Sequence, residues 1–195
     1  MCETEQGDSQ FKWVLKAESN SKYVLARCGV WEALVPQTVY SKGQIIILLP
    51  KSAEKPAFLG EMCKSIPQRN NAIRLIEEVA KAMVEALPDC SKVYLASLNE
   101  GALGLHFWLV PRNRSEHKGY LDQRDENGEE VNDGFALLSK LRGDFVERKK
   151  KGIWGTMPPE FDENWEGEWN DAWRRYAQAC LDMFKRWHEK IGSVG

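Results

Sequence analysis

The sequence predicts an α+β fold, in which an antiparallel sheet carries one packed amphipathic helix and a C-terminal helical extension. Three observations predict it. Short runs rich in aromatic and β-branched residues recur over 11–49 and again over 92–110, as they do in strands. Between them, apolar residues repeat at helical spacing over 67–87. A second helical pattern, rich in tryptophan, lies near the end of the chain.

The first strands are separated by short polar segments. The runs FKWVL (11–15) and KYVLARC (22–28) flank the polar KAESNS and predict a hairpin. The segment QTVY (37–40) predicts a weaker strand. The apolar run GQIIILLPKS (43–52), which carries Gly and Pro near its ends, predicts a central strand of the sheet.

The clearest helix follows. Ser65 and Gln68 form a capping-box-like start with Pro67 in the first turn, and a proline ends the pattern after residue 87. The residues that share the helical spacing are Ile73, Ile76, Val79, Ala80, Met83 and Leu87. After the helix, KVYLASL (92–98) and LHFWLV (105–110) predict two strands, which pair antiparallel because a short Gly-containing turn joins them.

The rest of the chain divides into a tail, a loop and two helices. Residues 1–9 are expected to form a flexible tail, and the polar stretch 113–133 a long surface loop. A helix is expected within 134–150. We expect the whole C-terminal extension, 134–195, to pack on the same domain as residues 10–112. Its last helix, of about 25 residues, has one aromatic face, formed by Trp165, Trp169, Trp173, Tyr176, Cys180, Phe184 and Trp187. A dimer interface is the alternative for that face.

The charge balance and the cysteines exclude several classes of protein. The formal net charge of −2 argues against a partner that is a nucleic-acid polymer, because such binders are usually strongly basic. Five cysteines without a CxxC pair indicate reduced thiols in a cytoplasmic protein, and the three histidines lie apart from them, which argues against a metal site. No signal peptide and no apolar run of about 20 residues is visible, so no membrane partner is expected.

A histidine interrupts the apolar strand LHFWLV. Strand alternation places Leu105, Phe107 and Leu109 toward the predicted helix, and it places His106 on the other face together with Trp108. An imidazole that points away from the main apolar layer is available for chemistry. From the strand pattern alone, a hydrogen-bonded structural histidine is the favoured interpretation of His106, and a catalytic histidine is the alternative.

The stretch GLHFWLVPR resembles the signature of the histidine triad superfamily, in which three histidines alternate with apolar residues and Pro-Arg often follows. Gly104 takes the first histidine position, His106 the second and Trp108 the third. The run SKGQIIILLPKS also resembles the family's strand Gly-His-apolar-Pro-Lys, with Gln44 in place of the histidine, and NEG resembles its Asn-x-Gly. The resemblance covers roughly residues 20–112.

The resemblance implies a histidine-triad-like α+β domain that binds a small-molecule nucleotide. In that family the middle histidine attacks the α-phosphorus, a covalent nucleotidyl-histidine forms, and water, phosphate or a sugar phosphate resolves it. His106 is therefore the expected catalytic residue, since imidazole is a good nucleophile near neutral pH and leaves phosphorus readily. No cofactor and no metal are implied, and a homodimer is expected because the family is often dimeric.

The chain lacks the first and third histidines of the triad. The indole of Trp108 donates one hydrogen bond but cannot transfer a proton to a leaving group, and loss of a general acid removes about 10²–10⁴-fold of rate. The loss of rate is smaller when the leaving group departs without taking up a proton. His117, in the polar loop, is interpreted as solvated surface rather than as a replacement. The residues expected to bind the nucleotide or its phosphates are Asn99, Gln44, Lys51, Trp108, Arg112 and Arg114.

The predicted function is that of a nucleotide-binding phosphohydrolase or nucleotidyltransferase that acts at a nucleotide α-phosphate through a covalent histidine. The alternative is a non-catalytic nucleotide-binding or interaction protein that kept the fold and lost the reaction. A purely structural module is a third hypothesis, because fold does not fix function.

Overall fold

The structure, a computed structural model, describes residues 10–37, 39, 41–49, 66–97, 105–113, 127, 139, 143 and 169–193. It is an α+β fold with a six-stranded antiparallel sheet and two helices over these residues. The tail 1–9, the segment 114–126 and most of the predicted helix 134–150 lie outside them, although Ser139 and Gly143 are helical.

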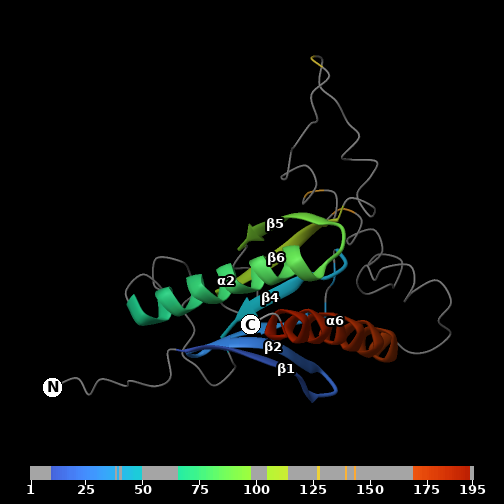
Figure 1. The fold of residues 1–195 in the computed structure, drawn as a ribbon, viewed down its shortest axis with the longest axis horizontal. Coiled ribbons are helices and arrows are strands. Elements are labelled where there is room, and N and C mark those ends of the chain that lie inside the picture. Colours follow the sequence, from blue (N-terminus) through green and yellow to red (C-terminus); the bar gives the residue numbers. More distant parts are fainter. Residues whose placement is uncertain are drawn as a thin grey trace.

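The sheet has the strand order β1-β2-β3-β4-β6-β5 (Figure 1). Its strands are β1 (Phe11–Ser19), β2 (Lys22–Cys28), β3 (Trp31–Leu34), β4 (Ile45–Leu48), β5 (Cys90–Ala96) and β6 (His106–Asn113). The predicted hairpin 11–28 and the antiparallel pairing of the last two strands are confirmed. The predicted central strand is also confirmed, because β4 lies between β3 and β6.

The described residues of the predicted strand 37–40, Gln37 and Val39, are not in a strand, and the strand β3 lies earlier in the chain. Gly29 and Val30 form a two-residue turn after β2, with Gly29 at φ +55°, so Trp31 pairs with Cys28. The last backbone hydrogen bond between these two chain segments is the one that the Val35 amide donates to the Tyr23 carbonyl at 3.1 Å. The next residue is a proline, which has no N–H with which to continue the ladder.

The helix α2 (Ile66–Ala86) confirms the predicted amphipathic helix and packs on one face of the sheet. Its buried residues are Ala72, Leu75, Val79, Ala82 and Met83. Ile73 is 45% exposed, so the buried face is rotated by about one residue from the predicted one. The fully buried Trp31 donates from Nε1 to the Gln68 carbonyl at 3.0 Å, which ties the start of α2 to β3.

The helix α6 (Trp169–Gly192) lies on the same face of the sheet as α2 (Figure 1). Residues 165–168, where the sequence predicts the start of this helix, lie outside the described residues. Part of its aromatic face is buried in the core, where Tyr176 and Phe184 are fully enclosed and Trp173 is 2% exposed. Tyr23 of β2 meets Trp173 edge to face, and Trp13 of β1 stacks on Phe184. One hydrophobic core therefore joins the sheet, α2 and α6.

Candidate functional site

His106 is the first residue of β6 and pairs with Leu48 of β4. It is 3% exposed. The Ser97 hydroxyl donates to the His106 carbonyl at 2.7 Å, which holds the strand ends of β5 and β6 together. The ring of Trp108 meets the imidazole edge to face, with 5.7 Å between the ring centres. The imidazole therefore lies against a large aromatic ring in a position largely shielded from solvent.

The faces of β6 follow the predicted alternation. Leu105, Phe107 and Leu109 belong to the core that α2 and α6 cover. His106 belongs to the opposite face, since adjacent strand residues point to opposite sides of a sheet. The residues that share this second face along β6 are Trp108, Val110 and Arg112. Val110 and Arg112 are also buried, so β6 is largely covered on both faces.

Arg112 and Gln44 lie toward the other end of the second face. Gln44 directly precedes the pair that Ile45 forms with Leu109, so it lies nearer to Arg112 than to His106. Arg112 is 5% exposed and Gln44 is fully buried. Arg112 lies six positions after His106 along β6, which corresponds to about 20 Å. The structure thus places the imidazole and the guanidinium at opposite ends of one strand face.

A small polar cluster fixes the Arg112 end of β6. The Asn113 side-chain amide donates to the Lys42 carbonyl at 2.9 Å and to the Ser41 hydroxyl at 3.3 Å. The Ser41 hydroxyl in turn donates to the Pro111 carbonyl at 3.1 Å. These bonds join the end of β6 to the turn before β4, and they set the position of the intervening Arg112.

Several predicted site residues lie outside the described residues. They are Asn99, Lys51, Arg114 and His117, together with Gly104 at the first triad position. The described part of the site therefore consists of His106, Trp108, Gln44 and Arg112. Within the described residues, no group of three or more histidine, cysteine, aspartate or glutamate side chains is arranged to hold a metal ion.

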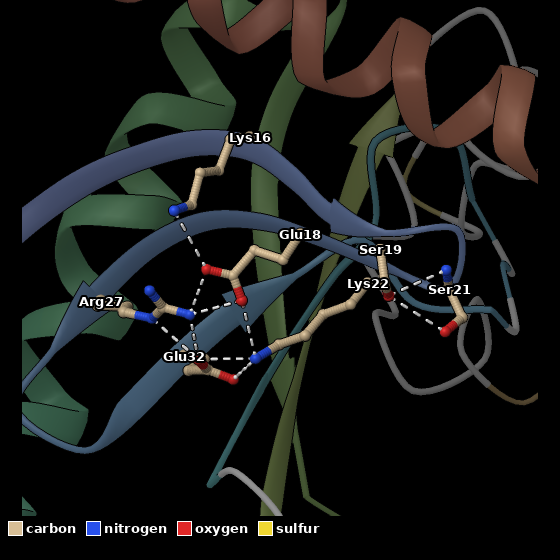
Figure 2. Close-up of polar contacts among 7 residues, drawn as sticks. All are labelled: Lys16, Glu18, Ser19, Ser21, Lys22, Arg27 and Glu32. Atoms are coloured by element: carbon tan, nitrogen blue, oxygen red, sulfur yellow. Dashed lines mark hydrogen bonds and ion pairs between the residues drawn. The ribbon is translucent and has the colours of Figure 1, made fainter.

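Sequence reasoning missed an ionic network on the strands β1 to β3, which we call the Glu32 network (Figure 2). Glu32, only 5% exposed, accepts from Lys22 at 3.0 Å and from Arg27 Nε at 2.9 Å. Glu18 accepts two 2.8 Å hydrogen bonds from the same guanidinium, and Lys16 approaches Glu18 at 3.6 Å. The sequence feature that could have revealed this network is the two-residue turn at Gly29 and Val30, which places Glu32 opposite Arg27.

The network perturbs the titration of its members. Desolvation raises the pKa of the Glu18 carboxyl, but hydrogen bonds from Arg27 and Lys22 more than offset it, so the pKa lies below its ordinary value. Desolvation lowers the pKa of Lys22, but hydrogen bonds to Glu32 and Glu18 outweigh it, so the pKa lies above its ordinary value. Glu18 and Lys22 are therefore both charged at neutral pH.

The Glu32 network shares a cross-strand row with His106. Arg27 pairs with Glu32, Glu32 with Leu48, and Leu48 with His106. Because paired residues point to the same face, these four side chains lie on the second face of the sheet. Two strand spacings, or about 10 Å, separate the backbones at Glu32 and His106. The network thus supplies the described fixed charges nearest to His106 in that row.

Replacing Glu32 with glutamine should lower the free energy of unfolding by about 1–2 kcal/mol, because it removes a buried charge that two partly exposed cations bind. Urea unfolding followed by circular dichroism measures this. Asp171→Asn is the matched control, since it breaks the exposed 2.8 Å pair with Arg174 and should change stability by less than about 0.5 kcal/mol. An equal change in the two variants would contradict a structural role of the network.

The sequence predicts a concave pocket at His106 shared with the segment 43–49. A cavity of about 950 Å³ touches that segment only at Gly43 among the described residues. It lies on the side of the sheet that the helices cover, and His106 is not among the described residues that line it. No helix among the described residues is long and apolar enough to cross a membrane.

No protein-family model matches the chain, and no curated protein matches it either.

Proposed function

We propose that this chain is a histidine-triad-like nucleotide-binding phosphohydrolase or nucleotidyltransferase, with His106 as the nucleophile. One observation carries the proposal. His106 lies at the start of β6 on the sheet face opposite the helices, and the stretch GLHFWLVPR that contains it resembles the triad signature. A histidine that served only to fill the core would be expected among Leu105, Phe107 and Leu109 instead.

The reaction has two balanced steps. A ring nitrogen of His106 donates an electron pair to the α-phosphorus, a P–N bond forms, and the P–O bond to the leaving group breaks. Water, phosphate or a sugar phosphate then attacks the same phosphorus, its proton is lost, and the P–N bond breaks to restore the free imidazole. Fixed donors around the phosphorus stabilise the charge on its equatorial oxygens. Asn99, Lys51 and Arg114 are the proposed donors outside the described residues.

The absence of the third histidine favours one class of leaving group. Trp108 cannot protonate a departing oxygen or nitrogen, because its indole N–H is a donor only. A phosphate or nucleotide that leaves as an anion needs no proton at the moment of cleavage. Phosphoric anhydrides, such as dinucleoside polyphosphates, are therefore the proposed substrates ahead of phosphoramidates or alkyl esters.

A second candidate function is nucleotide binding without turnover. The 3% exposure of His106 favours it, because a ligand reaches the imidazole only if the protein opens at that face. In that function the fold is retained and the reaction is lost. The predicted homodimer and the predicted cytoplasmic location stay predictions under either function.

A thermal-shift screen against nucleoside mono- and diphosphates and dinucleoside polyphosphates tests both candidates. A ligand at 100 times its dissociation constant should stabilise the protein by roughly 2.7 kcal/mol. Intact-mass analysis of the protein with the best ligand then separates the two functions. A nucleotidyl adduct on His106 with product release supports the enzyme, binding with neither supports the second candidate, and no stabilisation by any nucleotide contradicts both.

Arg112→Ala should weaken the binding of a dinucleoside polyphosphate by about tenfold, because arginine binds phosphate oxygens through a bidentate pair of hydrogen bonds. Binding of a nucleoside monophosphate at His106 should change by much less, since Arg112 lies about 20 Å away along the strand. Calorimetric titration of both ligands measures the difference. The wild-type protein is the reference. If Arg112→Ala binds both ligands with unchanged affinity, Arg112 is not part of the nucleotide site.

A further inference from the structure

The proposed function does not use the cavity of about 950 Å³ between the two helices, which we call the α6 groove. Its walls are one stripe of α6, from Tyr176 to Ile191, the end of α2, and the turn at Lys42 and Gly43. The two helices are adjacent in Figure 1. The α6 stripe extends over roughly 22 Å, since an α-helix rises 1.5 Å per residue.

The floor of the groove is a tightly built corner. The Gly43 amide donates to the buried Tyr176 hydroxyl at 2.9 Å. Gly43 has φ +83°, and a Cβ there would meet a Leu87 methyl carbon at 2.7 Å, so only glycine fits without rearrangement. Burial raises the pKa of the adjacent Cys180 thiol to about 11, so this side chain is neutral at physiological pH. The floor therefore has a fixed shape and carries no charge from its thiol.

The wall of the groove is apolar and open to solvent. Its apolar residues are Ala86, Pro88, Ala179, Met183, Trp187 and Ile191. Ile191 is 45% exposed although it lies in this stripe. The volume falls in the range of small-molecule sites, about 300–1,000 Å³, which favours a small ligand over a docked protein. An apolar ligand body would bury surface that is now in water.

Positive charge predominates at the rim. Arg186 and Lys190 lie one helical turn apart, so their side chains are neighbours on α6. Neither forms an ion pair with a carboxylate among the described residues, and like charges at this spacing repel each other. Glu85 is the acidic side chain among the described lining residues, and it accepts from Trp187 Nε1 at 3.0 Å. An anion placed between the two cations would relieve their repulsion.

We propose that the α6 groove binds a fatty acid, whose carboxylate bridges Arg186 and Lys190 and whose hydrocarbon chain lies on the apolar stripe of α6. The positive charge at the rim favours an anionic head group, and the apolar wall favours a hydrocarbon body. The site is separate from the proposed nucleotide site, because α2 and α6 cover the sheet face opposite His106.

Calorimetric titration with dodecanoate, below its micelle concentration at pH 8, tests the proposal on the full chain. Saturable binding at one site is expected. Dodecyltrimethylammonium has a hydrocarbon chain of the same length and a positively charged head group. It should bind at least about tenfold more weakly, because its head group would lie beside the cations Arg186 and Lys190. His106→Ala should bind dodecanoate as the wild type does, so failure of the nucleotide proposal leaves this result unaffected.

Variants locate the site. Arg186→Gln with Lys190→Gln should weaken dodecanoate binding at least about tenfold. Ala179→Trp should weaken it further, because an indole on the wall occupies part of the surface on which the hydrocarbon chain lies. Lys185→Gln is the matched control on the same helix, since Lys185 pairs with Asp182 at 3.8 Å and does not line the groove. Absence of dodecanoate binding, equal binding of the cationic detergent, or equal loss in the Lys185 control would each overturn the proposal.

Discussion

Replacing His106 with alanine is expected to abolish turnover of a dinucleoside polyphosphate, lowering kcat by at least about 10⁴-fold while affinity changes by no more than about threefold. The reason is that the proposed P–N intermediate needs an imidazole nitrogen, whereas binding relies on other groups. His106 lies edge to face with Trp108, 5.7 Å between ring centres, and alanine leaves that contact unfilled. Steady-state kinetics and calorimetric titration together measure the split.

Two further variants make the His106 result decisive. His106→Asn retains a polar side chain of similar volume, and it should lose turnover as alanine does while preserving the melting temperature. Trp108→Phe should retain turnover, because the indole supplies no proton to the leaving group. Intact-mass analysis should detect a nucleotidyl adduct on the wild type and on Trp108→Phe, but on neither His106 variant. Turnover that survives in His106→Asn would contradict the covalent-histidine mechanism.

The parts of the fold that sequence predicted have a strong local signal. The hairpin 11–28, the helix α2 and the strand pair β5–β6 each carry a hydrophobic period with turn or cap residues at its ends. Their mutual packing follows from one rule, that each apolar face must be buried. The face of β6 that carries His106 was predictable for the same reason.

The strand β3 was not predictable from local pattern. It is only four residues long, and its second residue is the charged Glu32. A charge in a strand is stable there because Arg27 lies opposite it and Lys22 binds it from the same strand as Arg27. That pairing depends on tertiary structure. The segment 37–40 has β-forming residues, but Pro36 has already ended the ladder.

The candidate site was predictable in part. Alternation predicted that His106 and Trp108 share one face, but the predicted strand ended at residue 110. It therefore did not show that Arg112 lies on the same face, about 20 Å from His106 along β6. Gln44 was predicted near the motif, and it lies at the Arg112 end because β4 runs antiparallel to β6. The α6 groove was not predictable, since it depends on how two distant helices and the Gly43 turn meet.

The aromatic stripe of α6 has two environments, and these lead to the largest stability prediction. Trp173 is 2% exposed, its Nε1 donates to the Pro36 carbonyl at 2.8 Å, and its ring meets Tyr23 edge to face at 5.4 Å. Trp187, on the same helix, is only partly buried and donates to the exposed side chain of Glu85. The two tryptophans therefore form an internal comparison.

Trp173→Ala is expected to lower the free energy of unfolding by about 3–5 kcal/mol, because it removes a buried aromatic side chain and leaves the Pro36 carbonyl without its donor. Such a loss is a large fraction of the stability of an ordinary domain. Trp187→Ala should lower stability by less than half as much, since solvent already covers part of that ring and water replaces its hydrogen-bond partner. Urea unfolding of both variants measures the difference, and Trp173→Phe gives an intermediate value if alanine prevents folding. Equal losses at the two positions would mean that α6 does not dock through Trp173, and that its tryptophan face serves to bind a partner instead.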